Sequence, residues 1–558
     1  MKLKKAVSLA LAATMVAGML SGCGEEKPAE TTAGTQAAGS VDASKSESDS
    51  TAADIGEEQT SEGSITYPID TDIELSLWSR ESLDVNQAYA SWEESPKHTA
   101  IADQTGVKIE WLYPAKGSDG NEAYNLMWMQ DELPNMVYAY LSPIKGAELI
   151  ADGLVYDLAE YLPEYAPDFW ELINRPEYAM ELKGMRTEDG KIFGLPNIKE
   201  DTYNLTWQGP YVRQDWLDEC GLDYPVTVED WENMLITFKE KYNALFIAEK
   251  GGLNGSGFMA SGFDALAFLS PALCVDNGEV VIAQAQPEWK EMMEVLHKWW
   301  DMGLIDKDTL TIDNDGIRNK AINNEVGVTF GAMSLGTNLR KDAAAENTGA
   351  DWVGIEMPRT AAGAPTSMIK CSPSKLSNYY TVVTTGCDEE ELITALKFLN
   401  YGYTEEGMLY WNFGVEGLNY TFDSDGTPQW TELITEDPAG LAAATLRYAF
   451  VGAGPSVQLA QLVKSRNDPV IAAAVDKWIA NTEAPSHYLP SLSLTEEESE
   501  IYTEKWTAIS TYVSEEAMKF WTGDSDLAEY DAFVEQMNKL GAQEVLDIMQ
   551  AAYDRFME

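Results

Sequence analysis

The chain of 558 residues is poor in histidine, in cysteine and in positive charge. Its 38 Lys and Arg stand against 92 Asp and Glu, which gives a formal net charge of −54. Binding to nucleic acid and adhesion to anionic lipid both require a basic surface, so this composition argues against both functions. It also makes phosphorylated or polyanionic ligands less expected, although a local basic pocket could still hold one.

Metal and haem sites are also not expected. Only three His are present, and the cysteines beyond Cys23 form no Cys-x-x-Cys pair and no Cys/His cluster. These four are Cys220, Cys274, Cys371 and Cys387. Their spacing does not decide between disulfides and buried free thiols, so both remain open.

The apolar run near the N-terminus is too short to span a membrane. It extends from Ala6 to Leu20, whereas a spanning helix needs about 20 residues. A basic segment precedes it and Leu20-Ser21-Gly22-Cys23 ends it, which is typical of an export signal. The ending resembles the bacterial lipobox, so we predict a signal peptide over 1–22 and a lipid anchor, including palmitate, at Cys23. An ordinary signal peptide with a chance Cys is the alternative.

Residues 24–64 contain almost no large apolar side chains. Such a segment cannot bury enough surface to offset the entropy lost on ordering. We therefore predict that 23–64 is a lipidated cysteine followed by a disordered linker.

From residue 65 the pattern alternates between strands and helices. Strands are predicted at 73–78, 107–111 and 135–140, with helices before Thr105 and at 121–131. This βαβ pattern indicates an α/β fold with a parallel sheet, in which ligands bind at the carboxyl ends of the strands. The residues at those ends are Trp78, Ser79, Arg80 and Tyr140.

Further helices follow along the chain. Thr227 and Asp230 form a predicted capping box at the start of one of them. Others are predicted at 215–220, 288–302, 389–401 and over most of the chain from 495. We assign the tryptophans on their apolar faces to the core, namely Trp216, Trp231, Trp299 and Trp300.

Several short segments carry a family resemblance through their order and spacing. They are Asp131-Glu132-Leu133-Pro134, Tyr211-Val212-Arg213 through Trp231, Gly303-Leu304-Ile305-Asp306, Thr404-Glu405-Glu406-Gly407, Asn412-Phe413-Gly414-Val415-Glu416-Gly417, and Ala551 through Phe556. Together they resemble family 1 extracellular solute-binding proteins of ABC importers. The similarity is to the branch of large oligosaccharide-binding lipoproteins of Gram-positive bacteria.

The resemblance implies a two-lobed periplasmic-binding-protein-like fold of class II, with a hinge and an interlobe cleft. Lobe 1 is then expected over 65–198 plus 357–425, and lobe 2 over 199–356 plus 426–558. The crossings are expected near 195–203 and 353–358, and the lobes close on the ligand by hinge bending. The resemblance further implies a monomer without enzyme activity or cofactor, held on the outer face of the membrane. It would deliver its ligand to two permease subunits driven by a cytosolic ATPase.

A sugar-binding cleft combines aromatic rings that stack on pyranose faces with a few polar groups for the hydroxyls. Tyr211 matches a tyrosine that resembles the sugar-stacking one of maltose-binding proteins, and Met333 falls where relatives often place a Trp. The full set of candidates is Trp78, Arg80, Tyr140, Tyr203, Trp207, Tyr211, Met333, Ser334, Asn338, Trp411 and Glu416. A core position for Trp78 or Trp207, a surface ion pair for Arg80 and a structural role for Glu416 remain open.

Some members of the family carry a calcium-binding acidic loop before the first crossing. Here the corresponding stretch is only Thr187-Glu188-Asp189-Gly190-Lys191. It offers too few spaced oxygens for the six to eight ligands that Ca²⁺ takes, so no calcium is expected in this loop.

Two other functions remain open. A secreted glycoside hydrolase would need a carboxylate pair at defined spacing, and 92 acids make chance pairs common. A solute-binding protein for a peptide or another non-sugar solute would share the fold and differ in the lining of the cleft.

Overall fold

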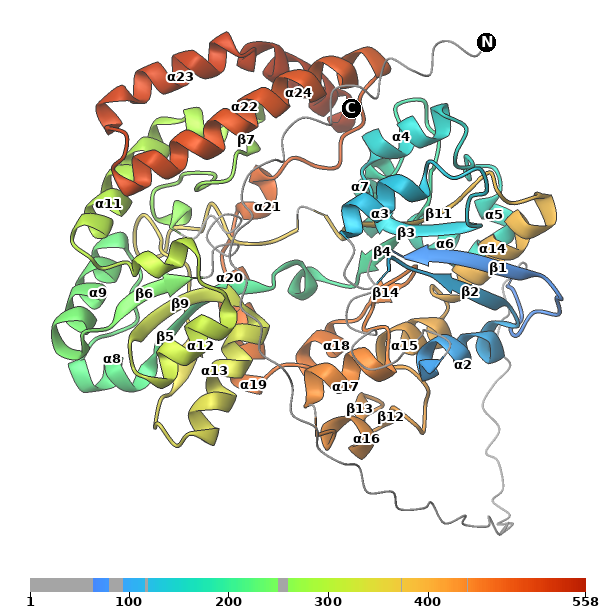
Figure 1. Cartoon of the computed structure of the whole chain (residues 1–558), viewed down its shortest axis with the longest axis horizontal. Helices are drawn as coiled ribbons and strands as arrows, with labels where there is room; N and C mark the ends of the chain where they lie inside the picture. The colour runs from blue at the N-terminus through green and yellow to red at the C-terminus, as the bar shows by residue number, and fades with distance from the viewer. Residues whose placement is uncertain (1–63, 80–93, 116–118, 249–258, 373, 439) are drawn as a thin grey trace, which may run out of the picture. The chain divides into compact units, whose positions relative to one another are not determined.

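The computed structural model describes residues 64–79, 94–115, 119–248, 259–372, 374–438 and 440–558. The predicted signal peptide, Cys23 and Arg80 lie outside the described residues. Within the described ranges, no helix is long and apolar enough to cross a membrane. The strands of this part form two main sheets, one in each lobe (Figure 1).

The first sheet has six strands in the order β14-β4-β11-β3-β1-β2. Their bounds are β1 Glu74–Ser79, β2 Lys108–Leu112, β3 Met136–Tyr140, β4 Leu195–Lys199, β11 Leu376–Val383 and β14 Val457–Gln458. Strand β1 pairs in parallel with both β2 and β3, which confirms the predicted βαβ arrangement. Strand β11 runs antiparallel to β3 and β4, so the sheet as a whole is mixed.

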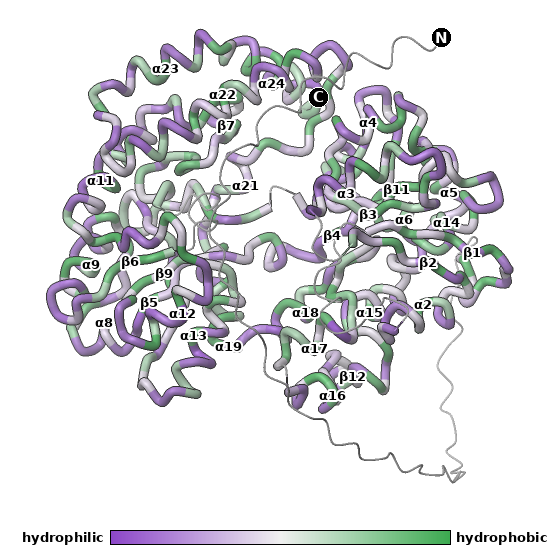
Figure 2. The backbone as a smooth tube through the Cα atoms, in the orientation of Figure 1, coloured by the Kyte–Doolittle hydropathy of each residue, from purple (hydrophilic) through white to green (hydrophobic). Residues whose placement is uncertain are grey.

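Alternation along the strands produces the first core. In β1, Leu75 and Leu77 are almost fully buried, whereas Glu74 is exposed. Figure 2 shows hydrophobic residues along the strands and hydrophilic residues at many outer turns. The helices of this lobe include α2 Pro96–Thr105, α3 Gly120–Met127, α4 Pro143–Ala151, α5 Leu162–Tyr165, α6 Pro167–Ile173, α7 Ala179–Gly184, α14 Glu389–Tyr401, α15 Glu405–Phe413, α16 Glu432–Thr435 and α17 Leu441–Tyr448.

The second sheet has four strands in the order β10-β5-β9-β6. Their bounds are β5 Gln208–Arg213, β6 Leu245–Ala248, β9 Val326–Ala332 and β10 Trp352–Gly354. Strand β5 pairs antiparallel with β9 and β10, and β6 pairs parallel with β9. Two small two-stranded sheets are β7 Leu273–Asp276 with β8 Glu279–Ile282, and β12 Tyr420–Phe422 with β13 Pro428–Trp430.

The predicted helices of the second lobe are confirmed. They begin and end at local signals: Thr227 and Asp230 form the predicted capping box of α9, and Gly221 ends α8 with a φ of 66°. The helices of this region are α8 Gln214–Cys220, α9 Val228–Tyr242, α11 Pro287–Asp301, α12 Asn314–Ile322, α13 Met333–Ala345, α18 Ala460–Ser465, α19 Pro469–Ala472, α20 Ala474–Ile479, α21 Ala484–His487, α22 Glu496–Thr522, α23 Tyr530–Lys539 and α24 Ala542–Met557.

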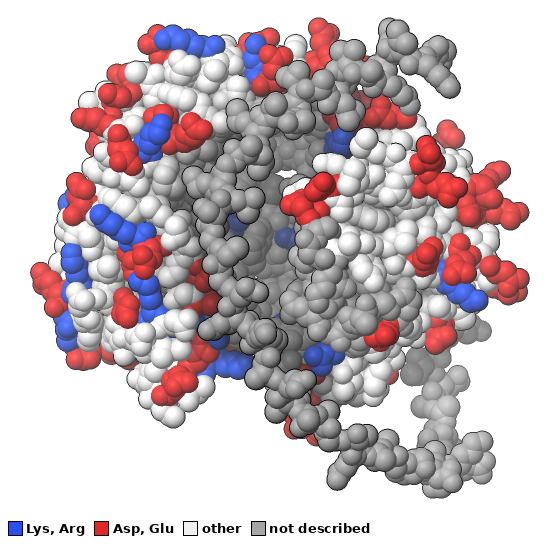
Figure 3. All heavy atoms as spheres, viewed as in Figure 1, with Lys and Arg blue, Asp and Glu red and all other residues white. Residues whose placement is uncertain are grey.

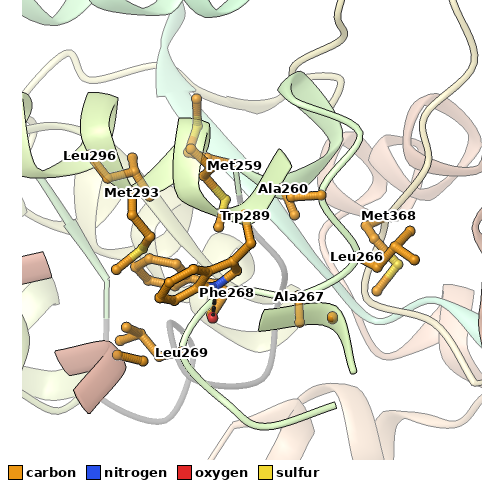
Figure 4. Close-up of a cluster of buried hydrophobic side chains, with 14 of the residues drawn as sticks. Met259, Ala260, Leu266, Ala267, Phe268, Leu269, Trp289, Met293, Leu296 and Met368 are labelled. Atoms are coloured by element: carbon orange, nitrogen blue, oxygen red, sulfur yellow. Dashed lines mark hydrogen bonds between the residues drawn. The ribbon is translucent and has the colours of Figure 1, made fainter. Parts of the chain in front are cut away.

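Buried aromatic side chains build the second core. Trp289 has no exposed surface, and its indole N–H donates to the carbonyl oxygen of Phe268 at 2.7 Å (Figure 4). Methionine and leucine side chains surround this pair in the same figure. The predicted core positions of Trp216, Trp231, Trp299 and Trp300 are confirmed, since all four are buried.

Two segments lie differently from the expected lobe limits, which otherwise stay a prediction. The segment that holds α16, α17 and β14 was expected in lobe 2, but β14 pairs with β4 in the first sheet and Phe450, just after α17, is buried in the core of the first lobe. Met368, Ile369 and Cys371 were expected in lobe 1, but they are buried in the core of the second lobe. In both cases contacts with residues far along the chain, and not the local sequence, decide which lobe the segment joins.

The structure decides between disulfides and free thiols for the four cysteines beyond Cys23. Cys220, Cys274, Cys371 and Cys387 are all free, and the last three are buried. Burial raises the pKa of each of these three thiols to about 12, so they stay protonated at neutral pH.

Candidate functional site

The candidate site lies where the chain passes between the two sheets. The first connection joins β4 to β5 through a short 3-10 turn at Thr202–Leu205. The second runs from β10 to β11, and the amide of Ser372 on it donates to the carbonyl oxygen of Leu205 at 2.8 Å. A third connection, between β14 and α20, was not foreseen. The connections therefore lie side by side and bring distant residues to one place.

Trp207 stands at the centre of this region. It follows the first connection and is partly exposed. Its carbonyl oxygen accepts a hydrogen bond from the amide of Met333, the first residue of α13. The structure thus brings together three of the predicted residues, since Ser334 comes next on the same helix and is exposed. Asn338 follows about one turn later and is half-buried.

Two lysine side chains lie against the ring of Trp207. The Nζ of Lys199, at the end of β4, is 4.9 Å from the ring centroid, and the Nζ of Lys370 is 5.5 Å from it. Lys199 also donates to the hydroxyl of Ser372 at 2.7 Å. Burial lowers the pKa of Lys199 to about 8 and lowers that of Lys370 as well, because a charged ammonium is less stable away from water.

Tyr140 lies at the carboxyl end of β3, as predicted, and 55% of its surface is exposed. Its hydroxyl accepts a hydrogen bond from Asn378 at 2.8 Å, and its ring centroid is 5.6 Å from that of Tyr379. Tyr379 also stacks on Tyr138. This group of three tyrosines offers aromatic surface at a strand end, where sheets of this kind bind ligands.

Several residues that were predicted to contact the sugar lie in the core instead. Tyr211 has no exposed surface; its ring packs against Trp478, and its hydroxyl has no hydrogen-bond partner among the described residues. Tyr203 is 5% exposed and its hydroxyl donates to the carbonyl oxygen of Ala472. Trp78 and Met333 are likewise buried. The prediction that Tyr211 stacks on a sugar is wrong for this conformation, because no face of its ring is accessible.

The Asn-Phe-Gly-Val-Glu-Gly motif separates into a structural part and an exposed part. Asn412 bonds to the backbone of β14 and of Leu459, and Trp411 is buried against Phe450. Glu416 is exposed and lines a pocket of about 190 Å³ with Gln104 and Tyr420. The residues of this pocket are different from those around Trp207, so Trp411 and Glu416 do not join that group.

A larger cavity of about 540 Å³ lies between α4, the 187–191 turn and the start of α22. Its lining includes six acids and one lysine, and no aromatic side chain. The turn is closed by its own side chains, since the hydroxyl of Thr187 donates to Asp189 at 2.6 Å and Lys191 pairs with Asp189. Within the described ranges, no group of His, Cys, Asp or Glu could hold a metal ion.

Three residues of the site region were missed from the sequence: Lys199, Lys370 and Tyr379. Lys199 lies within the predicted first crossing, so its place near Trp207 was a usable signal. Lys370 and Tyr379 carried no such signal, because they approach Trp207 and Tyr140 only through pairing of segments far apart in sequence.

No protein-family model matches the sequence. Lipoprotein LipO of Bacillus subtilis (strain 168) is 23% identical over 491 residues, covering 83% of this chain and 89% of LipO. The polygalacturonan/rhamnogalacturonan-binding protein YtcQ of the same organism is 20% identical over 485 residues, with the same coverage of 83% and 89%. The fructooligosaccharide ABC transporter substrate-binding protein FusA of Streptococcus pneumoniae serotype 4 (strain ATCC BAA-334 / TIGR4) is 23% identical over 256 residues, which are 41% of this chain and 45% of FusA.

Solved structures share the fold. Alginate-binding protein AlgQ2 without calcium ion matches with a TM-score of 0.69 at 20% identity, over 88% of this chain and 99% of that one. FusA of S. pneumoniae in complex with kestose matches with a TM-score of 0.68 at 19% identity, over 87% and 99%. The two sheets with their connections therefore form the two-lobed α/β fold that was predicted. In fold, and in relatives that match over most of its length, the chain is therefore similar to extracellular solute-binding proteins of ABC transporters.

Proposed function

We propose that this protein captures an oligosaccharide outside the cell and delivers it to an ABC permease. The observation that carries the proposal is Trp207, a partly exposed indole at the connections between the lobes, beside the exposed Ser334. An indole offers an apolar plate for the C–H face of a pyranose, and neighbouring polar groups select the hydroxyls. The relatives whose names state a ligand are named for carbohydrates, which supports the same ligand class.

The mechanism we propose is binding without covalent chemistry. The lobes close around the sugar by bending at the connections near 195–203 and 353–358, with lobe 1 and lobe 2 as predicted apart from the two differences above. Ligand that contacts both lobes stabilises the closed state, and the permease recognises that state. The protein acts as a monomer in this scheme.

The location we propose is the outer face of the membrane, with acyl chains on Cys23 as the anchor and 24–64 as the spacer. LipO is a lipoprotein by name, which supports this anchor. Replacing Cys23 by Ser should release the protein into the medium and abolish uptake of the sugar by the cells. Retention of the Cys23→Ser protein at the membrane would contradict the proposed anchor.

The test of the binding function is calorimetry of the purified protein against a panel of oligosaccharides, combined with detection of released sugars. We expect saturable binding of at least one oligosaccharide and no release of shorter products. Trp207→Ala should weaken that binding about 10- to 100-fold, the range expected for loss of one stacked aromatic anchor. Trp506→Ala is the matched control, because Trp506 is also partly exposed but lies on α22 and stacks on Tyr502.

The outcomes distinguish the alternatives. Release of shorter sugars would establish a hydrolase instead. Binding of peptides in place of every oligosaccharide would establish a different cargo. Equal affinity of the Trp207→Ala and wild-type proteins for the bound sugar would keep the function and refute the position of the site.

A further inference from the structure

Trp207 lies in contact with two cationic side chains, and this arrangement bears on the kind of sugar that binds. We propose that Lys199 and Lys370 form an anion-binding subsite beside Trp207, and that the captured oligosaccharide carries a carboxylate, as an oligouronate does. This inference rests on the proposed function and names the ligand class of the same site.

The geometry matches the shape of a hexuronate. Such a sugar has a pyranose ring with a carboxylate attached at its edge, so one residue presents an apolar face and a charge side by side. The ammonium groups of Lys199 and Lys370 lie over the ring of Trp207, 4.9 and 5.5 Å from its centroid, and part of the residue remains exposed. A sugar that packs on the exposed part of the indole would therefore hold its carboxylate close to two positive charges.

The two lysines are brought together by pairing of distant segments. Lys199 ends β4, and Lys370 comes just before the segment that hydrogen-bonds to the first connection through Ser372 and Leu205. Cys371, between Lys370 and Ser372, is buried and forms an isolated bridge with Thr206, directly before Trp207. The lysines thus project from anchored backbone, which pre-organises a binding subsite.

The electrostatic setting of Lys199 favours an anionic partner. Burial holds its pKa at about 8, and its ammonium contacts a neutral hydroxyl and an aromatic ring. The carboxylate of Glu200, the next residue, accepts a hydrogen bond from the amide of Ala460 at 2.7 Å, so it is bonded to the start of α18. A bound carboxylate would offset the cost of keeping this ammonium away from water.

The net charge of −54 makes this local arrangement stand out. Figure 3 shows acidic side chains over much of the visible face, with some basic atoms inside its hollow. An anionic sugar would be repelled by such a protein at long range, so its capture requires positive charge concentrated at the site itself. Lys199 and Lys370 supply that charge at the ring of Trp207, which both side chains contact.

The test is calorimetry with a panel of oligouronates, each paired with its methyl ester. Esterification keeps the rings and linkages and removes the charge. We expect at least one oligouronate to bind about tenfold or more tightly than its ester, as loss of a charge-assisted hydrogen bond predicts. Lys199→Met and Lys370→Met should each lower affinity for the acid about tenfold and leave affinity for the ester within about twofold.

Two controls separate the charge from folding and from general electrostatics. Lys199→Arg keeps the charge and should retain most of the preference for the acid. Lys539→Met removes an exposed lysine that pairs with Glu535 on α23, and should behave as the wild type. The melting temperature of each ligand-free variant shows whether it is folded.

Equal affinity for acid and ester would overturn the inference and leave the proposed function intact. So would binding of neutral oligosaccharides alone, with no oligouronate bound. Failure of every oligosaccharide, acidic or neutral, to bind would refute the proposed function itself.

Discussion

Trp289 and Trp207 are the same residue type in two regions of one molecule, and their surroundings assign them different roles. Trp289 has no exposed surface, its N–H is bonded to a backbone carbonyl, and Phe520, Phe533 and Tyr530 pack around it. Trp207 is partly exposed at a connection between lobes, with lysines on its ring. Aromatic content alone therefore does not locate a sugar site. Access to the ring face and the charge beside it do.

The largest expected effect is on stability, and it tests whether Trp289 supports the core more than Trp207 does. Trp289→Ala should lower the free energy of unfolding by about 3–5 kcal/mol, because it leaves a cavity in a packed core and removes the shorter of two hydrogen bonds to the carbonyl of Phe268. Trp207→Ala should lower it by only about 1 kcal/mol, since Trp207 is partly exposed and lies outside the packed core. Urea denaturation of both variants measures the difference. Equal losses would show that Trp207 is a core residue too.

A smaller effect, the change of affinity with pH, tests the role of the lysine charge beside Trp207. The pKa of Lys199 is lowered to about 8, so its ammonium is charged below that pH and neutral above it. Affinity for an acidic sugar should therefore fall, by up to about tenfold, as the pH rises from 7 to 9.5. Bound carboxylate raises this pKa, so binding near pH 8 should take up protons, which calorimetry in buffers of different ionisation enthalpy detects.

The groups that contact Lys199 set the controls for this pH experiment. They are the Ser372 hydroxyl and the Trp207 ring. The Cys371 thiol acts on Lys199 electrostatically, and its own pKa is raised to about 12 and so lies above the window. In the ligand-free protein the sign is opposite: the unfolded chain binds more protons between pH 8 and its ordinary lysine pKa, so Lys199 makes stability rise with pH. A pH profile that is unchanged in Lys199→Met would assign the titration to another group.

The smallest expected effect concerns Tyr211. Its hydroxyl is buried and has no partner among the described residues, so Tyr211→Phe should leave the free energy of unfolding unchanged or raise it by less than about 1 kcal/mol. Its affinity for the sugar should equal that of the wild type. Thermal melts and calorimetry check both values, and a clear loss of affinity would return Tyr211 to the site.

Local patterns predicted most of the fold. Alternating leucines identified β1, and the Thr227–Asp230 capping box identified the start of α9, because both signals depend on neighbouring residues. Strand β14 and the burial of Met368 were not predictable in this way. Both depend on contacts with segments far along the chain, which leave no periodic trace in the sequence.

The candidate site likewise contains residues that local sequence could predict and residues that it could not. Trp207 and Tyr140 could be proposed because each follows an element whose end was predicted, and both have accessible surface. Tyr211 could not be distinguished from them by sequence, since a ring that faces Trp478 and a ring that faces a cleft share the same strand pattern.

The sequence by itself determined the α/β class, the helix ends, the acidic surface and the order of the elements, because these follow from local composition and spacing. Only the tertiary structure decided which aromatic rings are accessible and which charges stand beside them. Two lysines 171 positions apart meet at one indole through backbone pairing between the connections, and no property of either neighbourhood in sequence encodes that contact.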